Sequence, residues 1–176
     1  MTTFDLLSPA WYVLHTRSRH EETVRTGLAR KSVTVFLPKI ATPSRRRDRR
    51  VVLQVPLFPG YLFVYTGLAP EQHLQILKTV GAVRLIGNRK GPLPVPADAI
   101  ESLKIIVATN SEVETGTTFR RGDRVMVTRG PFTGVSGVFV RYKGHSRIMV
   151  NIEALGQFAA VEVQAEDVIP LSDAAR

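Results

Sequence analysis

The alternation of apolar and polar positions divides the chain into a first part that mixes strands and helices and a second part made of strands. Runs of aromatic and β-branched residues indicate strands, and apolar residues three or four apart indicate helices. In the first part, strands are expected at 11–15, 33–37, 51–55, 61–64 and 83–86, with helices starting near 18–21, 69–71 and 96–98. Helices that alternate irregularly with hairpin-joined strands favour an α+β domain, in which helices pack on an antiparallel sheet.

The second part follows a polar stretch, residues 110–118, that has no apolar period and is typical of a linker. Beyond it, short strands are expected at 124–128, 138–142, 147–152, 160–163 and 168–169. About five short strands within about fifty residues favour a small β-barrel. We therefore predict two domains, residues 10–108 and residues 119–171, joined by a linker at 109–118.

The most informative strand follows a turn inside residues 55–64, which read V-P-L-F-P-G-Y-L-F-V. Pro59 and Gly60 are turn residues, and an aromatic run begins at Tyr61. Strand alternation puts Tyr61 and Phe63 on one face and two aliphatic residues on the other. A strand that is apolar on both faces is either central in its sheet or keeps one face for a partner. The residues alone leave both interpretations open.

The first expected helix begins with the pattern of a capping box, because Ser18 and Glu21 are three residues apart. Arg17, Arg19 and His20 crowd the same helix start. Positive charge at a helix N-terminus opposes the helix dipole, so these side chains do not serve the helix. We interpret them as groups that bind a ligand, with a solvated surface as the alternative.

Composition narrows the possible classes of protein. The chain has 176 residues, of which 44% are hydrophobic, so it can form a core. No apolar run approaches the ~20 residues of a membrane span, and we see no signal-peptide pattern at the N-terminus. The absence of cysteine fits a cytoplasmic protein. The formal net charge of +9 predicts attraction to a polyanion, most simply nucleic acid.

Much of this charge lies in residues 43–50, P-S-R-R-R-D-R-R, between two expected strands. Arginines so close together repel one another, so they do not stabilise the fold. Their forked donors suit phosphate, and we predict that they contact the backbone of DNA or RNA. A solvated loop tip is the alternative, and the lack of aromatic residues argues against base stacking. The arginines are Arg45, Arg46, Arg47, Arg49 and Arg50.

No pattern in the chain indicates catalysis. The four histidines are not at metal-binding spacing, and thiols are absent. There is no G-x-S-x-G nucleophile elbow and no phosphate loop that ends in Gly-Lys. We therefore expect neither an enzyme nor a metal or cofactor site.

Several short motifs in a fixed order resemble the NusG family of transcription elongation factors. The motifs are Trp11-Tyr12-Val13, Phe58-Pro59-Gly60-Tyr61-Leu62-Phe63-Val64, Gly122-Asp123-Arg124-Val125, Gly130-Pro131-Phe132 and Gly134-Val135-Ser136-Gly137. The resemblance covers nearly the whole chain and identifies 10–108 with the NusG N-terminal domain and 119–171 with the KOW domain. Residues 56–64 and the basic hairpin also resemble specialised members such as RfaH, whereas Gly60 is the ordinary NusG residue.

This resemblance implies a binding protein without catalysis. In the family, the N-terminal domain docks on the clamp helices of the largest RNA polymerase subunit and suppresses pausing. The corresponding aromatic pocket contains His15, Phe58, Pro59, Tyr61 and Phe63. Arg17, Arg19 and His20 match the place where specialised members read the exposed non-template DNA strand.

For the KOW domain, the resemblance implies a small-subunit ribosomal protein or the termination factor Rho as partner. The contact strands would contain Phe132, Ile148 and Val150. We expect a monomer with no membrane contact that modulates transcription pausing or termination. The alternative is a stand-alone RNA-binding or ribosome-associated KOW protein, in which the arginine-rich tract does most of the binding.

Overall fold

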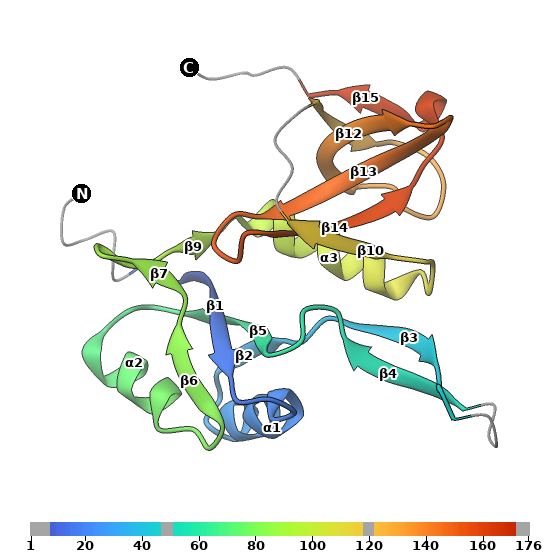
Figure 1. Cartoon of the computed structure of the whole chain (residues 1–176). Coiled ribbons are helices and arrows are strands. Elements are labelled where there is room, and N and C mark those ends of the chain that lie inside the picture. The colour runs from blue at the N-terminus through green and yellow to red at the C-terminus, as the bar shows by residue number, and fades with distance from the viewer. Residues whose placement is uncertain (1–7, 47–50, 118–121, 172–176) are drawn as a thin grey trace. The chain divides into compact units, whose positions relative to one another are not determined.

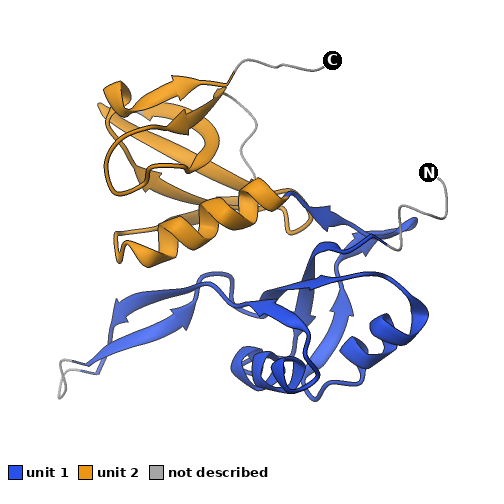
Figure 2. Cartoon of the chain, turned by 180° about the vertical axis from the view of Figure 1, so that it is seen from behind, with its two compact units in different colours: residues 1–96 blue, residues 97–176 orange. Residues whose placement is uncertain are grey.

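The structure is a computed structural model that describes residues 8–46, 51–117 and 122–171 (Figure 1). The chain forms two compact units, residues 1–96 and residues 97–176 (Figure 2). Within the described ranges, none of the helices is both long and apolar enough to cross a membrane.

Unit 1 is built on an antiparallel sheet with β1 near its centre. The strand order is β2-β5-β1-β6, and β9 also pairs with β1. The strands are β1 (Ala10–Thr16), β2 (Thr34–Phe36), β5 (Tyr61–Thr66), β6 (Ala82–Leu85) and β9 (Pro94–Val95). The expected antiparallel sheet is thus present, and the run that begins at Tyr61 is one of its inner strands.

Both helices of unit 1 contribute to a core on one face of this sheet. Helix α1 (Glu21–Arg30) supplies Val24 and Leu28, and helix α2 (Pro70–Leu77) supplies Ile76. They share this core with the alternate sheet residues Tyr12, Leu14, Leu62, Val64 and Leu85. The opposite face of β1 and β5 carries the intervening residues, which include most of the aromatic ones. The strand alternation predicted for Tyr61 and Phe63 is confirmed.

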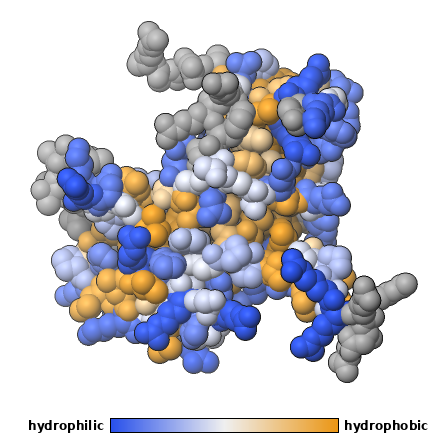
Figure 3. Space-filling model, in the orientation of Figure 1, coloured by the Kyte–Doolittle hydropathy of each residue, from blue (hydrophilic) through white to orange (hydrophobic). Residues whose placement is uncertain are grey.

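Two small hairpins complete unit 1. Strands β3 (Lys39–Pro43) and β4 (Val52–Pro56) form their own two-stranded sheet, and so do β7 (Gly87–Asn88) and β8 (Gly91–Pro92). The β3–β4 hairpin is poorly covered, because Val52 is 66% exposed and Leu53 46% exposed. Figure 3 shows hydrophobic and strongly hydrophilic residues side by side at the lower right, where this hairpin lies.

Unit 2 consists of helix α3 (Ala97–Ala108), a six-stranded antiparallel sheet and a short 3-10 turn, η1 (Ala165–Asp167). The strand order is β10-β14-β13-β12-β11-β15. The strands are β10 (Glu114–Thr117), β11 (Asp123–Val127), β12 (Ser136–Tyr142), β13 (His145–Ile152), β14 (Gln157–Glu162) and β15 (Val168–Pro170). Helix α3 packs against β12 and β13. The strands agree with an all-β second part, and closure into a barrel stays a prediction.

The compact units do not coincide with the predicted domains 10–108 and 119–171. Helix α3 belongs to the same compact unit as the strands of unit 2. Its residues Ser102 and Leu103 are buried, and the helix packs on β12 and β13. The predicted linker at 109–118 contains β10, whose residues pair with β14 from Glu114↔Ala160 to Thr117↔Gln157. The residues of β10 are polar or glycine, so the strand has no apolar period for the sequence to reveal.

Candidate functional site

Aromatic side chains lie in cross-strand pairs on the sheet face opposite α1 and α2. Trp11 and Tyr65 have ring centroids 5.4 Å apart, and the rings of His15 and Tyr61 are stacked with centroids 5.2 Å apart. Phe63 sits between these pairs on the same face, since its register partner is Val13. Aromatic pairs at these distances contribute specific contacts beyond the area that they bury.

The predicted aromatic pocket separates into buried and accessible residues. Phe58 and Phe63 are each only 1% exposed, and their rings meet edge to face at 6.3 Å. His15 and Tyr61 are half-buried, and Pro59 is exposed. Of the five predicted residues, His15, Pro59 and Tyr61 are thus the ones that reach the surface.

A hollow of about 570 Å³ lies beside the stacked pair. Its lining residues come from the end of β1, the turn that leads into α1, the end of β4 and the turn before β5. They are His15, Thr16, Ser18, Arg19, Glu21, Pro56, Pro59 and Gly60. We call it the Gly60 hollow. It combines proline rings with polar groups, so it suits a ligand that brings both apolar and hydrogen-bonding atoms.

Backbone hydrogen bonds fix the turn that forms one wall of this hollow. Gly60 has φ +83°, a left-handed conformation that glycine adopts without strain. Its carbonyl accepts from the Thr16 N–H at 2.8 Å, and its own N–H donates to a carboxylate oxygen of Glu21 at 2.7 Å. Tyr61 N–H closes the turn on the Phe58 carbonyl at 3.1 Å.

Glu21 supports the turn at Gly60, a role that its local sequence pattern does not predict. The capping box predicted from Ser18 and Glu21 is wrong. The N-cap residue of α1 is His20, which makes no side-chain cap hydrogen bond. Glu21 is 7% exposed and turns to Gly60 instead. A partner 39 residues away leaves no local signal in the sequence.

The three predicted cations at the start of α1 lie together in one turn. Arg17 and Arg19 are exposed and His20 is half-buried. Arg19 has φ +61°, and His20 Nδ1 lies 2.8 Å from the Ser18 carbonyl oxygen. The turn thus holds two guanidinium groups at the surface next to the Gly60 hollow, which Arg19 also lines.

The described part of the arginine-rich tract, Arg45 and Arg46, follows the end of β3 in unit 1. Arg45 and Arg46 are exposed. Arg47, Arg49 and Arg50 fall outside the described residues.

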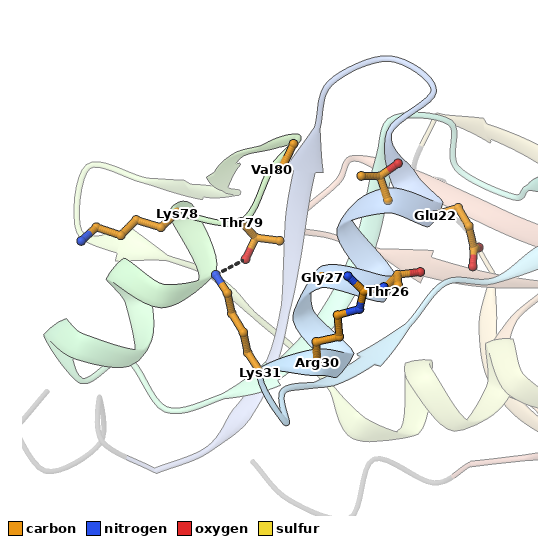
Figure 4. A pocket seen from close by; sticks show the side chains of 9 residues that line it. Glu22, Thr26, Gly27, Arg30, Lys31, Lys78, Thr79 and Val80 are labelled. Atoms are coloured by element: carbon orange, nitrogen blue, oxygen red, sulfur yellow. Dashed lines mark hydrogen bonds between the residues drawn. The ribbon is translucent and has the colours of Figure 1, made fainter.

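A second groove, of about 730 Å³, runs between α1 and the turn after α2 (Figure 4). Its lining residues are Glu22, Thr23, Thr26, Gly27, Arg30, Lys31, Lys78, Thr79 and Val80. Lys31 Nζ donates to the Gln75 carbonyl at 2.8 Å and to Thr79 Oγ1 at 2.9 Å, and so ties the two elements together. Val80 is 74% exposed. We call this hollow the α1 groove.

The cations of the α1 groove carry no distinctive pattern in the sequence. Arg30 and Lys31 follow one another at the C-terminal end of α1, where positive charge is an ordinary helix-stabilising feature. Lys78 is the C-cap residue of α2, as Lys31 is of α1. Only packing brings the three to one groove.

Glu22 is the acidic residue of this groove, and it is neutralised within unit 1. Hydrogen bonds from Arg25 and from Lys39, the latter at 2.6 Å, lower the pKa of Glu22 to about 2. Since Glu22 is the one acid among the lining residues, the remaining cations give the α1 groove a positive character.

Similarity to known proteins identifies the family of the chain. A family model described as "Transcription termination factor nusG" matches residues 9–104, which is more than half of the chain. The chain belongs to the NusG family. Transcription factors of this family are non-enzymatic, in agreement with the expectation that the chain is not an enzyme.

Curated NusG relatives match over nearly the whole length. The Thermus thermophilus transcription termination/antitermination protein NusG is 26% identical over 93% of this chain and 99% of its own. The protein of the same name from Borreliella burgdorferi is 24% identical over 92% and 98%. A solved structure on domain interaction in Thermotoga maritima NusG has a TM-score of 0.54 at 20% identity, and covers 95% of this chain. The similarity to this solved structure supports the fold described above.

In this NusG protein, the residues predicted to bind a KOW partner lack an accessible surface. Phe132 is 7%, Val150 2% and Ile148 0% exposed, since all three point into the interior of unit 2. The sequence identified apolar strand positions but not which face they occupy. Within the described ranges, no group of three or more histidine, aspartate or glutamate side chains is placed to hold a metal ion.

Proposed function

We propose that this NusG protein is a transcription termination/antitermination factor that binds RNA polymerase through the accessible end of its aromatic sheet face. The observation that carries the proposal is the His15–Tyr61 stack beside the Gly60 hollow. Family membership supports the general role, and the NusG relatives bear it in their names. The polymerase element is the pair of clamp helices expected from the resemblance.

The geometry suits a protein partner at this position. The two helices of unit 1 both pack on the other face of the sheet, so neither covers the aromatic side chains. His15, Pro59 and Tyr61 offer apolar surface and ring edges. Phe58 and Phe63 are buried and pack on each other. Aromatic residues around a partly buried hollow are the common anchors of protein–protein interfaces. Suppression of pausing would follow from binding there.

Nucleic acid would be a second partner, bound by cations of unit 1. Arg17, Arg19 and His20 share one exposed turn, and Arg45 and Arg46 are exposed at the hairpin. The α1 groove adds Arg30, Lys31 and Lys78. These groups favour phosphate contacts, which predicts that affinity falls steeply as salt rises.

Unit 2 would recruit a second protein, either a small-subunit ribosomal protein or Rho. Because Phe132, Ile148 and Val150 are buried, such a partner would use other residues of unit 2. Two binding units on one chain raise the effective concentration of the second partner at the polymerase.

The test is co-purification with core RNA polymerase. His15→Ala and Tyr61→Ala should weaken binding and retain the fold, whereas His145→Ala, an exposed histidine of unit 2, should bind normally. Phe58→Ala is a poor test, because a buried phenylalanine costs about 3–5 kcal/mol of stability when truncated. Equal binding by folded His15 and Tyr61 variants would refute the polymerase-binding site. Transcription past a pause site and a terminator would then measure the activity.

The alternative, a stand-alone RNA-binding or ribosome-associated protein, is favoured by the exposed arginines of the hairpin. Deletion of residues 45–50 separates the two functions. It should abolish RNA binding if the alternative holds, and it should only weaken polymerase binding if the proposed function holds.

A further inference from the structure

Arg84 lies in register with the stacked aromatic pair. His15 pairs with Tyr61 of β5 on one side and with Arg84 of β6 on the other. Directly paired residues of an antiparallel sheet point to the same face. The next pair, Leu14 and Leu85, is buried in the core under α1 and α2, so Arg84 shares the opposite face with His15. The sheet thus presents a row of three side chains, Tyr61, His15 and Arg84.

Strand β6 is the last strand of the sheet order, so Arg84 ends this row at the sheet edge (Figure 1). Its side chain is exposed. It forms no ion pair with any residue in the described ranges, whereas Arg25, Arg124, Arg129 and Arg147 all do. The exposed guanidinium of Arg84, next to the aromatic pair, is therefore available to bind an anionic group of another molecule.

The surrounding charge strengthens this conclusion. Arg17 and Arg19 are exposed close by in sequence to His15, and they too form no ion pair within the described part of the chain. The acid that lines the Gly60 hollow, Glu21, is buried and hydrogen-bonded to Gly60. No carboxylate of the row itself balances the positive charge at this end of the sheet.

We propose that Arg84 is a specificity-determining contact for a protein partner, and that this partner presents a carboxylate side chain to it. The partner would pack an apolar side chain on His15 and Tyr61 and place the aspartate or glutamate beside that side chain. The inference rests on the proposed polymerase binding, and it adds the chemical character of the bound surface. A guanidinium binds a carboxylate with two parallel hydrogen bonds, which lysine does not reproduce.

The observations favour a protein over nucleic acid at this row. His15 and Tyr61 stack on each other, so each ring already has one face covered. Two proline rings, Pro56 and Pro59, line the adjoining hollow. Nucleic-acid binding instead uses open aromatic faces along a track of cations. The α1 groove, with Arg30, Lys31 and Lys78, is a better match to such a track.

The test is the equilibrium affinity of the full chain for purified core RNA polymerase. Arg84→Ala should weaken binding about tenfold, and Arg84→Glu should weaken it further, because it adds repulsion. Arg84→Lys should restore only part of the affinity. Arg89→Ala removes an exposed arginine from the neighbouring β7–β8 turn and should bind like the unmodified protein. The effect of Arg84→Ala should shrink as salt rises.

Four further results decide the outcome. Restoration of Arg84→Glu binding by an aspartate- or glutamate-to-lysine change in the polymerase would establish the ion pair. If His15→Ala and Tyr61→Ala weaken binding but the Arg84 variants do not, this inference is wrong and the proposed function stands. If none of these variants weakens binding, the proposed function itself fails. An equal loss of affinity for a single-stranded DNA oligonucleotide would overturn the choice of a protein partner.

Discussion

Glu21 and Gly60 are joined by a hydrogen bond in which the Gly60 N–H donates to Glu21 Oε1 at 2.7 Å. This bond connects the first residue of α1 to the turn that carries Pro59 and leads into Tyr61. Because Glu21 is only 7% exposed, water replaces its carboxylate poorly. The start of one helix thus holds the wall of the Gly60 hollow in place.

Glu21→Ala should therefore destabilise unit 1 by about 1–2 kcal/mol, since it leaves the partly buried Gly60 N–H without its acceptor. It should also speed hydrogen exchange at the Gly60 amide. Glu21→Gln retains an amide oxygen at the same position and should recover most of both properties. Denaturant unfolding and amide exchange of the three proteins provide the measurement. Unchanged exchange at Gly60 in Glu21→Ala would contradict the role.

Gly60 itself allows a second prediction, because its φ of +83° strains any other residue. Gly60→Ala should cost about 1–2 kcal/mol of stability and should also weaken polymerase binding. Gly144 is a matched control, with φ +81° in unit 2 and open space around it. Gly144→Ala should lose similar stability without loss of binding. The two variants are compared by thermal unfolding and by polymerase affinity. If Gly60→Ala binds polymerase as well as Gly144→Ala does, the Gly60 turn is not part of the polymerase-binding site.

Local patterns predicted both helices of unit 1 and five of its strands, but they missed β3, β7, β8 and β9. They predicted long-range partners poorly. Period-two alternation placed Tyr61 and Phe63 on one face correctly, because side-chain direction in a strand depends on position alone. Their exposure differs, since Phe63 packs against Phe36 and Phe58 from other parts of the chain. The same reasoning explains Glu21, whose local pattern suggested a cap. Instead of capping the helix, its carboxylate accepts the hydrogen bond from Gly60.

In the second part, period and glycine spacing predicted five strands but not the sixth. Thr115 and Thr117 of β10 lie in a polar segment, and their pairing with β14 depends on backbone groups that every residue has. Ile148 and Val150 are buried because tertiary packing within unit 2 covers their face of β13, and α3 packs on this strand. Apolar strand residues alone do not distinguish a binding face from a core.

Glu22 gives a prediction for pH dependence. Its pKa is lowered from 4.5 to about 2 by Arg25 and Lys39. A carboxyl group with a lowered pKa in the folded state stabilises the fold above its ordinary pKa, and this contribution is lost as the pH falls from 4.5 toward 2. The side chain is half exposed, so the contribution should stay below about 1 kcal/mol.

Glu22→Gln should accordingly be slightly less stable than the unmodified protein at neutral pH, and the difference should vanish near pH 2. Glu101→Gln is the control, because Glu101 forms one exposed pair with Lys104 and has no second cation among the described residues. Chemical unfolding across this pH range measures both variants. A difference for Glu22→Gln that grows on acidification would have the wrong sign and would refute the assignment.

Ser102 provides the last prediction, on the attachment of α3 within unit 2. Its hydroxyl accepts the Ser136 N–H at 3.0 Å and donates to the Ser136 carbonyl at 3.4 Å, and the side chain is 1% exposed. Ser102→Ala leaves the buried N–H of Ser136 without an acceptor, which should cost about 1–3 kcal/mol. Protection of the α3 amides against hydrogen exchange should fall, because the helix loses its polar anchor on β12.

The exposed Ser111, just beyond the end of α3, is the matched control. Ser111→Ala should leave both stability and amide exchange unchanged, because its hydroxyl faces solvent. If Ser102→Ala unfolds at the same denaturant concentration as Ser111→Ala, with equal protection of α3, then the apolar residues of the helix alone attach it to the sheet. A selective loss of protection in α3 would instead identify the Ser102–Ser136 pair as the contact that holds the helix to β12.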